Sequence, residues 1–229
     1  MAQTLFKNEK YEATGETKEY CGVTLYRIRA VAEITALGIS TGQLGGWIEK
    51  PANLSVSGDA WVYGDARVSG NARVSGNAQV SGDAWVSGDA WVSGNAQVSG
   101  DARVSGNAWV YGNAWVYGNA RVSGDAQVYG NARVSGDAQV YGNAQVYGNA
   151  QVSPVTITGL AWTVTIADRE MVIGCQHHEI DRWWKFTDRQ IAAMDTRALA
   201  FWHEHKAALQ ALCKATGRPF AKVEAELAA

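Results

Sequence analysis

The sequence predicts a mainly β protein built around a left-handed parallel β-helix of about five coils. Residues 56–151 consist of sixteen six-residue repeats without insertion or deletion, from VSGDAW to VYGNAQ. Within each repeat, apolar and polar side chains alternate until a Gly-Asp or Gly-Asn pair interrupts the alternation. A short half-buried strand followed by a corner, recurring every six residues, is typical of a β-solenoid.

Each position of the repeat has a structural reason. The first, third and fifth positions are always Val, Gly and Ala, and the sixth is always Trp, Arg or Gln. Alternation along a strand predicts that Ala60 and Val62 point inward, while Trp61 and Tyr63 point outward. Gly tolerates positive φ, and Asn or Asp visits the left-handed region more readily than most residues. Three such corners close a coil of eighteen residues, and successive coils stack about 4.8 Å apart.

The repeats resemble the hexapeptide-repeat superfamily over these 96 residues. The resemblance implies the left-handed coil and a tendency to form homotrimers. Members of that family include acyltransferases and carbonic-anhydrase-like enzymes, whose chemistry uses histidines and loops that leave the helix. Here the repeats contain no His, Cys, Glu or Lys, and no loop interrupts them. The resemblance therefore carries a fold to this chain, but no active site.

Stacking at an interval of eighteen residues places the sixth-position side chains in three outward columns. The first column holds Trp61, Gln79, Gln97, Trp115, Arg133 and Gln151. The second holds Arg67, Trp85, Arg103, Arg121 and Gln139. The third holds Arg73, Trp91, Trp109, Gln127 and Gln145, beside a row of Tyr111, Tyr129 and Tyr147. Aromatic residues and Arg are the types enriched at binding interfaces.

Two uses of these columns are open. In the first, a homotrimer buries one or two faces of the solenoid. In the second, the columns form a recognition surface or inter-subunit cleft for a small anionic, nucleotide-like ligand, because Arg beside Trp or Tyr suits flat rings with negative charge. Trp or Tyr alone would suit sugars. Cation–π stacking is expected along the second column. The candidate ligand-binding residues of the repeats are Arg67, Trp85, Arg103, Arg121, Trp91, Trp109 and Tyr111.

Residues 1–53 are expected to form a β-rich cap, and residues 54–153 the solenoid. A cap would cover the open edge of the first coil, since exposed strand edges invite aggregation. Leu54 already occupies the Ala position of a repeat. The segments GVTLYRIRA, LGGWIEK and NLS together resemble the entry block of β-helix proteins from phages, prophages and enteric bacteria. That resemblance implies a phage or prophage origin.

Residues 154–229 are expected to form an α+β domain. Strands are predicted at residues 155–157, 162–166 and 171–176. Thr187 and Gln190 have the form of a capping box, a longer helix is predicted at 196–216, and a short one at 221–228. His178, Arg182, Trp183 and Trp184 are expected to line a binding pocket at a helix end.

The cysteines and histidines of the C-terminal part suggest two further chemistries. Cys175, His177 and His178, with His203 and His205, could offer zinc ligands or a nucleophile pair. Their spacing matches no signature of either kind, so the sequence predicts no metal site, no catalytic residue and no cofactor. Stacked corner carboxylates could hold a cation, although Asp and Asn there also serve the turn.

The preferred hypothesis is a non-enzymatic phage protein that sequesters a ligand such as a defence signal. The N-terminus lacks the apolar run of a signal peptide, and no stretch suits a membrane helix, so a bacterial cytoplasmic location is expected. Five Arg against seven Asp in the repeats disfavour nucleic-acid binding. The alternative is a structural or assembly module of a virion, such as a fibre or spike trimer. A hexapeptide-type acyltransferase is less favoured, because a catalytic base is lacking.

Overall fold

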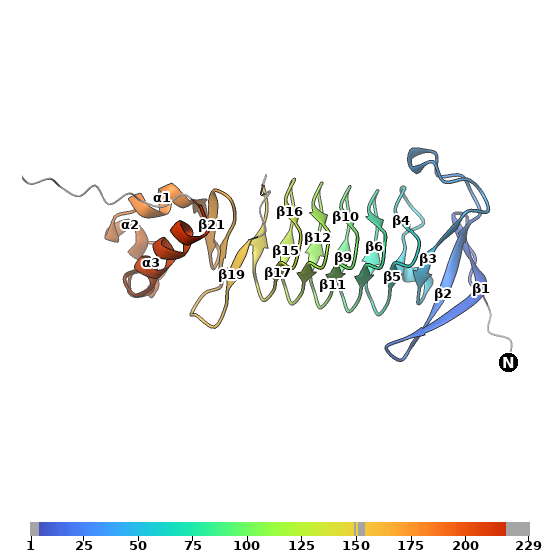
Figure 1. Ribbon diagram of the computed structural model, residues 1–229, viewed down its shortest axis with the longest axis horizontal. Coiled ribbons are helices and arrows are strands. Elements are labelled where there is room, and N and C mark those ends of the chain that lie inside the picture. The colour runs from blue at the N-terminus through green and yellow to red at the C-terminus, as the bar shows by residue number, and fades with distance from the viewer. Residues whose placement is uncertain (1–4, 149, 151–153, 219–229) are drawn as a thin grey trace, which may run out of the picture. The chain divides into compact units, whose positions relative to one another are not determined.

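The computed structural model describes residues 5–148, 150 and 154–218 of the chain (Figure 1). The chain divides into two compact units, Met1–Pro154 and Val155–Ala229. Each unit has its own core, and each is described by itself.

The first unit contains a parallel β-solenoid, which confirms the predicted repeat architecture (Figure 1). Repeats contribute two-residue strands, each pairing in parallel with the strand eighteen residues further on, as Trp91 pairs with Trp109. One sheet contains β4 (Trp61–Val62), β7 (Gln79–Val80), β10 (Gln97–Val98), β13 (Trp115–Val116) and β16 (Arg133–Val134). The next contains β5 (Arg67–Val68), β8 (Trp85–Val86), β11 (Arg103–Val104), β14 (Arg121–Val122) and β17 (Gln139–Val140). The third contains β6 (Arg73–Val74), β9 (Trp91–Val92), β12 (Trp109–Val110), β15 (Gln127–Val128) and β18 (Gln145–Val146).

The interior of the solenoid consists of stacked Ala and Val side chains. From Ala60 to Val134, every Ala and Val of the repeats is at most 1% exposed. Burying these methyl groups is the main stabilising term, at about 25 cal/mol per Å² of apolar surface. The core therefore depends on small side chains that fill a narrow prism uniformly.

The corners stack as closely as the strands. Gly94 has a φ of +67°, and a Cβ at this position would lie 3.0 Å from the backbone nitrogen of Gly112 in the next coil. Outside the corner, Asn77 donates from Nδ2 to Oδ1 of Asn95 at 3.1 Å, and Asn95 donates likewise to Asn113 at 3.0 Å. Gly at the third position and Asn or Asp at the fourth thus serve coil-to-coil packing as well as the turn.

The segment before the repeats adds a rung that the repeat pattern does not show. A hairpin of β1 (Tyr11–Tyr20) and β2 (Val23–Ala30) continues through η1 (Thr35–Leu37) to β3 (Leu44–Ile48). β3 is antiparallel to β2 but parallel to β5, with Ile48 opposite Val68. After η2 (Pro51–Asn53), Leu54 pairs with Val74 rather than stacking on Ala72. The solenoid therefore has about six turns, and its first coil is two residues longer than the others.

The hairpin covers the open end of the first coil. Trp61, predicted to point outward from the coil, is fully buried, and Tyr11 packs edge-on against it at 6.4 Å. The hydroxyl of Tyr11 lies 2.8 Å from the Leu54 carbonyl, and Lys10 Nζ donates to the Gly58 carbonyl at 2.9 Å. Burial lowers the pKa of Lys10 to about 8 and raises the pKa of Tyr11 to about 12.

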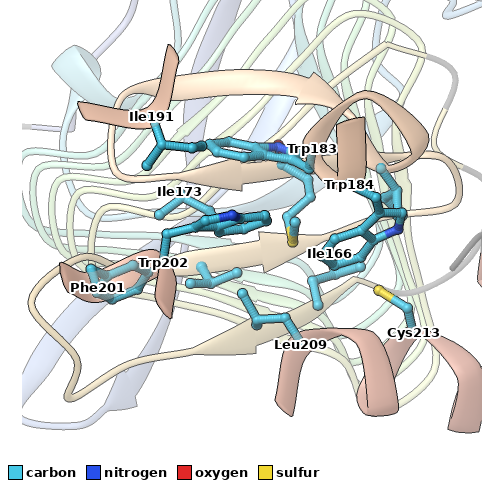
Figure 2. Close-up of a cluster of buried hydrophobic side chains, with 12 residues drawn as sticks. Ile166, Ile173, Trp183, Trp184, Ile191, Phe201, Trp202, Leu209 and Cys213 are labelled. Carbon is cyan, nitrogen blue, oxygen red and sulfur yellow. The ribbon is translucent and has the colours of Figure 1, made fainter. Parts of the chain in front are cut away.

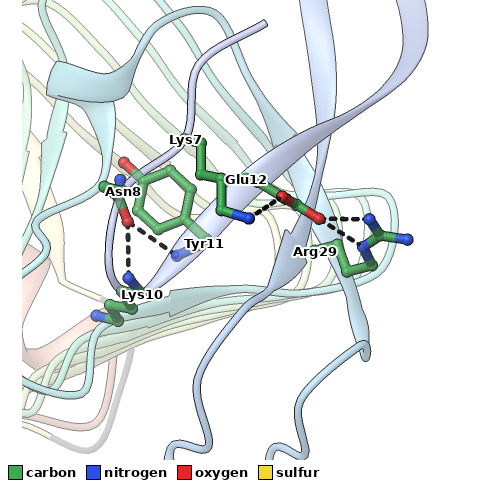
Figure 3. A network of polar contacts seen from close by, with 6 residues as sticks. All are labelled: Lys7, Asn8, Lys10, Tyr11, Glu12 and Arg29. Carbon is green, nitrogen blue, oxygen red and sulfur yellow. Dashed lines mark hydrogen bonds and ion pairs between the residues drawn. The ribbon is translucent and has the colours of Figure 1, made fainter.

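A second polar network ties β1 to its neighbours (Figure 3). Glu12 accepts hydrogen bonds from the Arg29 guanidinium and forms an ion pair with Lys7 at 3.0 Å. These cations lower the pKa of the Glu12 carboxyl. The Asn8 side chain accepts from the backbone nitrogen of Tyr11 at 2.8 Å and fixes the start of β1.

The second unit is an antiparallel sheet followed by helices. The sheet contains β19 (Val155–Ile157), β20 (Val164–Ile166), β21 (Glu170–Ile173) and β22 (Gln176–Glu179) in sequence order. The helices are α1 (Ile180–Lys185), α2 (Asp188–Ala192) and α3 (Ala198–Ala215). Trp183, Trp184 and Trp202 pack with aliphatic side chains between sheet and helices (Figure 2). The helix expected at 221–228 lies outside the described residues.

Candidate functional site

The outward side of the sheet β6-β9-β12-β15-β18, called the third face below, carries the most exposed tryptophans. Trp91 and Trp109 are 41% and 45% exposed. Their rings meet edge to face, with centroids 5.6 Å apart and an interplanar angle of 77°. The indole nitrogen of Trp91 donates to Oγ of Ser75 at 2.9 Å. The Trp91 ring is thus held by a hydrogen bond, and the Trp109 ring packs against it, while much of both rings meets solvent.

A tyrosine ladder continues the third face toward later coils. Tyr111 and Tyr129 stack with centroids 4.9 Å apart and planes within 3°. Tyr129 and Tyr147 stack at the same distance with planes within 6°. A ligand ring cannot insert into such a ladder without separating the coils. The Trp91–Trp109 pair is therefore the part of the third face on which a flat ring can stack.

Two open hollows adjoin the tryptophan pair. One has a volume of about 370 Å³ and is lined by Asn71, Arg73, Asp89, Ala90, Trp91 and Trp109. The other has a volume of about 220 Å³ and is lined by Trp91, Ser93, Trp109 and Tyr111. The structure thus brings together the predicted residues Trp91, Trp109 and Tyr111.

The larger hollow carries charge as well as aromatic surface. Lys50 Nζ donates to Oδ1 of Asn71 at 3.0 Å, and Nδ2 of Asn71 donates to Oδ1 of Asp89 at 3.0 Å. Arg73 is exposed and makes no ion pair with any residue of the described part of the chain. The hollow is thus lined by one cation, Arg73, and one carboxylate, Asp89, while Lys50 contacts Asn71 from outside the lining. A ligand that carries both a negative charge and a hydrogen-bond donor would match these groups.

In the second column, the contacts differ from the predicted cation–π stacking of its Arg and Trp side chains. Arg67 stacks at 4.3 Å over the ring of Tyr20, which belongs to the hairpin, rather than on Trp85. Tyr20 also meets Trp85 edge-on at 5.1 Å. Arg103 and Arg121 are exposed on later coils, beyond the hairpin contact. The hairpin therefore takes up Arg67 and Trp85 as intramolecular contacts, and these two residues do not join the third-face site.

The first column offers one further aromatic–cation pair. The Arg133 guanidinium lies 5.2 Å from the ring centroid of Trp115, which is 37% exposed. Trp115 also contacts Tyr117 at 5.5 Å. This pair resembles Arg73 and Trp91 in composition, but its cation already has an aromatic partner.

The C-terminal residues predicted as a pocket lie in two different surroundings. Trp184 is buried against Trp202, with centroids 5.7 Å apart. His178 packs against Phe186 at 4.8 Å, and the guanidinium of Arg182 lies over the same ring at 5.7 Å. Burial lowers the pKa of His178.

A cavity of about 70 Å³ occurs elsewhere in this unit. It is lined by Trp162, Ile173, Cys175, Gln176, Trp183, Ile191, Met194, Asp195, Ala198, Phe201 and Trp202. Of the four residues predicted to line a pocket, Trp183 lines this cavity, and Trp184 packs in the core. A pocket shared by His178, Arg182 and Trp184 stays a prediction. The spacing of aromatic residues in the sequence did not indicate that α3 contributes Ala198, Phe201 and Trp202 to this cavity.

Among the described residues, no group of three or more His, Cys, Asp or Glu side chains could hold a metal ion. His177 instead faces Glu170 at 3.1 Å, and His203 faces Asp188 at 3.1 Å. Within the same described part, no helix has the length and apolarity needed to cross a membrane.

Two residues of the third-face site were not among the candidates. Arg73 precedes Trp91 in its column, and this position in the sequence could have identified it as a neighbour of the tryptophan pair. Lys50 lies outside the repeats, and only the twenty-residue offset of the first coil brings it to Asn71. No repeat pattern could have indicated Lys50.

The fold and its surface define a β-solenoid repeat protein with an aromatic, cation-bordered face. In agreement with this class, the family model of the YdcK beta-solenoid repeat matches residues 66–78, 78–94, 96–112, 114–127, 126–142 and 138–153. The matched segments cover most of the hexapeptide repeats, and the last one runs two residues beyond them. A comparison with curated proteins gives no significant match.

Proposed function

We propose that this protein is a non-enzymatic binding protein that holds a small anionic, nucleotide-like ligand on its third face. The observation that carries the proposal is the fixed, exposed Trp91–Trp109 pair beside the unpaired cation Arg73. Stacking of a base on an aromatic side chain contributes about 1–3 kcal/mol, and a charge-assisted hydrogen bond contributes a similar amount. Together these terms suit a ligand that combines a flat ring with negative charge.

A binding role suits this site better than catalysis. Asp89 is the carboxylate among the residues that line the larger hollow, and this lining includes neither His nor Cys. General acid–base chemistry at neutral pH usually needs such a group with a pKa near 7. A ligand is therefore expected to leave the site unchanged, as in sequestration of a defence signal by a phage protein in the bacterial cytoplasm.

The oligomeric part of the proposal is a homotrimer of left-handed solenoids. Trp115 and Tyr141, both 37% exposed, lie outside the third face and suit contacts between protomers. The strict period of six favours the left-handed sense of the coil. A trimer would present three copies of the third-face site.

The proposal is tested by equilibrium binding of a panel of linear and cyclic nucleotides, measured by tryptophan fluorescence and by calorimetry. We expect at least one member of the panel to bind, and a Trp91→Ala, Trp109→Ala double variant to lose about tenfold or more in affinity. A Trp85→Ala variant is the matched control, since Trp85 contacts the hairpin on another face. Absence of binding across the whole panel would remove this function.

The second candidate function is a structural or assembly module of a virion. The stacked tyrosine ladder and the Asn77–Asn95–Asn113 ladder favour it, because both stiffen a solenoid along its axis. Recovery of the protein in stoichiometric amounts from purified particles, with no nucleotide bound, would support this alternative.

A further inference from the structure

We infer that the larger hollow of the third face is a subsite for a 5′-phosphorylated purine that carries an exocyclic amino group. The phosphate would lie at Arg73 and Lys50, the ring on Trp91 and Trp109, and the amino group at Asp89. This inference rests on the proposed function and adds the orientation and chemical class of the ligand.

The cationic end of the hollow identifies where the phosphate lies. Arg73 is one strand before Trp91 in the same sheet, so the two backbones lie about 4.8 Å apart along the solenoid axis, and both side chains line the hollow. Lys50 reaches the same coil through Asn71. Arg binds phosphate through paired hydrogen bonds, and Lys adds a point charge.

The two indoles of the next two coils offer a place for a flat ring. Because their planes are 77° apart, such a ring would stack on one indole and meet the other edge-on. Trp91 and Trp109 both line the hollow that contains Arg73. The hydrogen bond from Trp91 to Ser75 fixes one indole before a ligand arrives, which reduces the entropy lost on binding. A two-ring purine covers more of this surface than a pyrimidine does, so purines stack more strongly.

The carboxylate of Asp89 supplies the selectivity for an amino group. Its Oδ1 accepts from Asn71, and the side chain borders the same hollow as the indoles. An ionised carboxylate only accepts hydrogen bonds, and an exocyclic amine only donates them. A purine with a carbonyl oxygen in place of the amine would instead meet Asp89 with two acceptors facing each other.

The test measures binding of AMP, adenosine and inosine 5′-monophosphate to the full-length protein by calorimetry. AMP is expected to bind about tenfold or more tightly than adenosine, because only AMP carries the phosphate. Arg73→Gln should reduce AMP affinity by a similar factor while leaving adenosine affinity unchanged. AMP should also bind more tightly than inosine 5′-monophosphate, and Asp89→Asn should abolish that difference.

Arg133→Gln is the matched control, since Arg133 also lies beside a tryptophan but on another face. Equal effects of Arg73→Gln and Arg133→Gln on AMP, in a protein that still binds nucleotides, would overturn the subsite and leave the proposed function standing. Equal binding of AMP and adenosine would likewise overturn the phosphate assignment. Failure of every nucleotide to bind would remove both the subsite and the proposed function.

Discussion

Trp91 donates its indole N–H to Oγ of Ser75, sixteen residues earlier, across 2.9 Å. The side chain therefore leans back over the preceding coil, which is the coil that carries Arg73. Trp85 makes the equivalent bond to Ser69 at 3.1 Å, so the arrangement recurs on a second face. A Ser at the second position of one repeat thus orients a Trp of the next coil.

Ser75→Ala should weaken ligand binding with little loss of stability. The lost bond lies at the surface, so the free energy of unfolding should fall by less than about 1 kcal/mol. Affinity for the best-binding nucleotide should fall by about threefold to tenfold, because the indole is no longer held in place. Calorimetry and thermal unfolding of the variant, beside Ser69→Ala as control, check this. Equal binding by both variants would contradict the orienting role of Ser75.

Gly94→Ala should destabilise the solenoid more than Gly64→Ala. Both glycines have positive φ, so each substitution costs about 1–2 kcal/mol in backbone strain. Only at Gly94 would the new Cβ also meet the next coil, 3.0 Å from Gly112 N, which adds about 1–3 kcal/mol of overpacking. Denaturant unfolding of the two variants measures the difference, and equal destabilisation would argue against close packing of the corners.

Two residues of the cap, Lys10 and Tyr11, should make the free energy of unfolding first rise and then fall with increasing pH. Lys10 has a folded pKa of about 8 against 10.5 for the unfolded side chain, so above pH 8 the unfolded chain holds more protons and stability rises with pH. Tyr11 has a folded pKa of about 12 against 10.0, so above pH 10 the unfolded chain holds fewer protons and stability falls. The free energy of unfolding should therefore pass through a maximum near pH 10.

Denaturant unfolding at a series of pH values between 7 and 11.5 measures this profile. Lys10→Met should flatten the rising limb, and Tyr11→Phe should weaken the falling limb. A stability that decreases steadily from pH 8 would contradict the buried placement of Lys10.

Trp202→Ala should unfold the second unit without loosening the solenoid. Trp202 is 2% exposed and stacks with Trp184, and its truncation should cost about 3–5 kcal/mol. The two units have separate cores, since the cluster around Trp202 contains only residues of the second unit. Hydrogen exchange should show protection lost at β20 and α3 but kept at β9 and β12. Loss of protection in both units would contradict separate cores.

The repeats predict the solenoid well because Val, Gly and Ala recur at the same three positions of every six-residue repeat. The entry coil escapes that rule, since β3 reads LGGWI and lacks the Val-Gly-Ala spacing. Its double glycine was nevertheless a signal, because a Cβ at Gly45 would lie 2.8 Å from the Trp61 ring and one at Gly46 would lie 2.6 Å from a methyl of Val62. Close approach of two coils requires glycine there.

The candidate site was predicted in part. Stacking at eighteen residues places Trp91 beside Trp109, and the pairing in the structure agrees. The burial of Trp61 and the stacking of Arg67 on Tyr20 could not be predicted, because both depend on where a hairpin outside the repeats packs. Exposure of an outward residue in a solenoid is decided by the segments that pack over it, and repeat position alone does not decide it.

Native mass spectrometry of the protein, purified gently from phage-infected bacteria, tests ligand sequestration most directly. We expect three protomers of 24.6 kDa with added mass of a few hundred daltons per site, of order one nucleotide, lost on denaturation. The Trp91→Ala, Trp109→Ala variant should carry none of this mass. A protein free of added mass in both forms would contradict a ligand-binding third face and assign the exposed tryptophans to protein contacts.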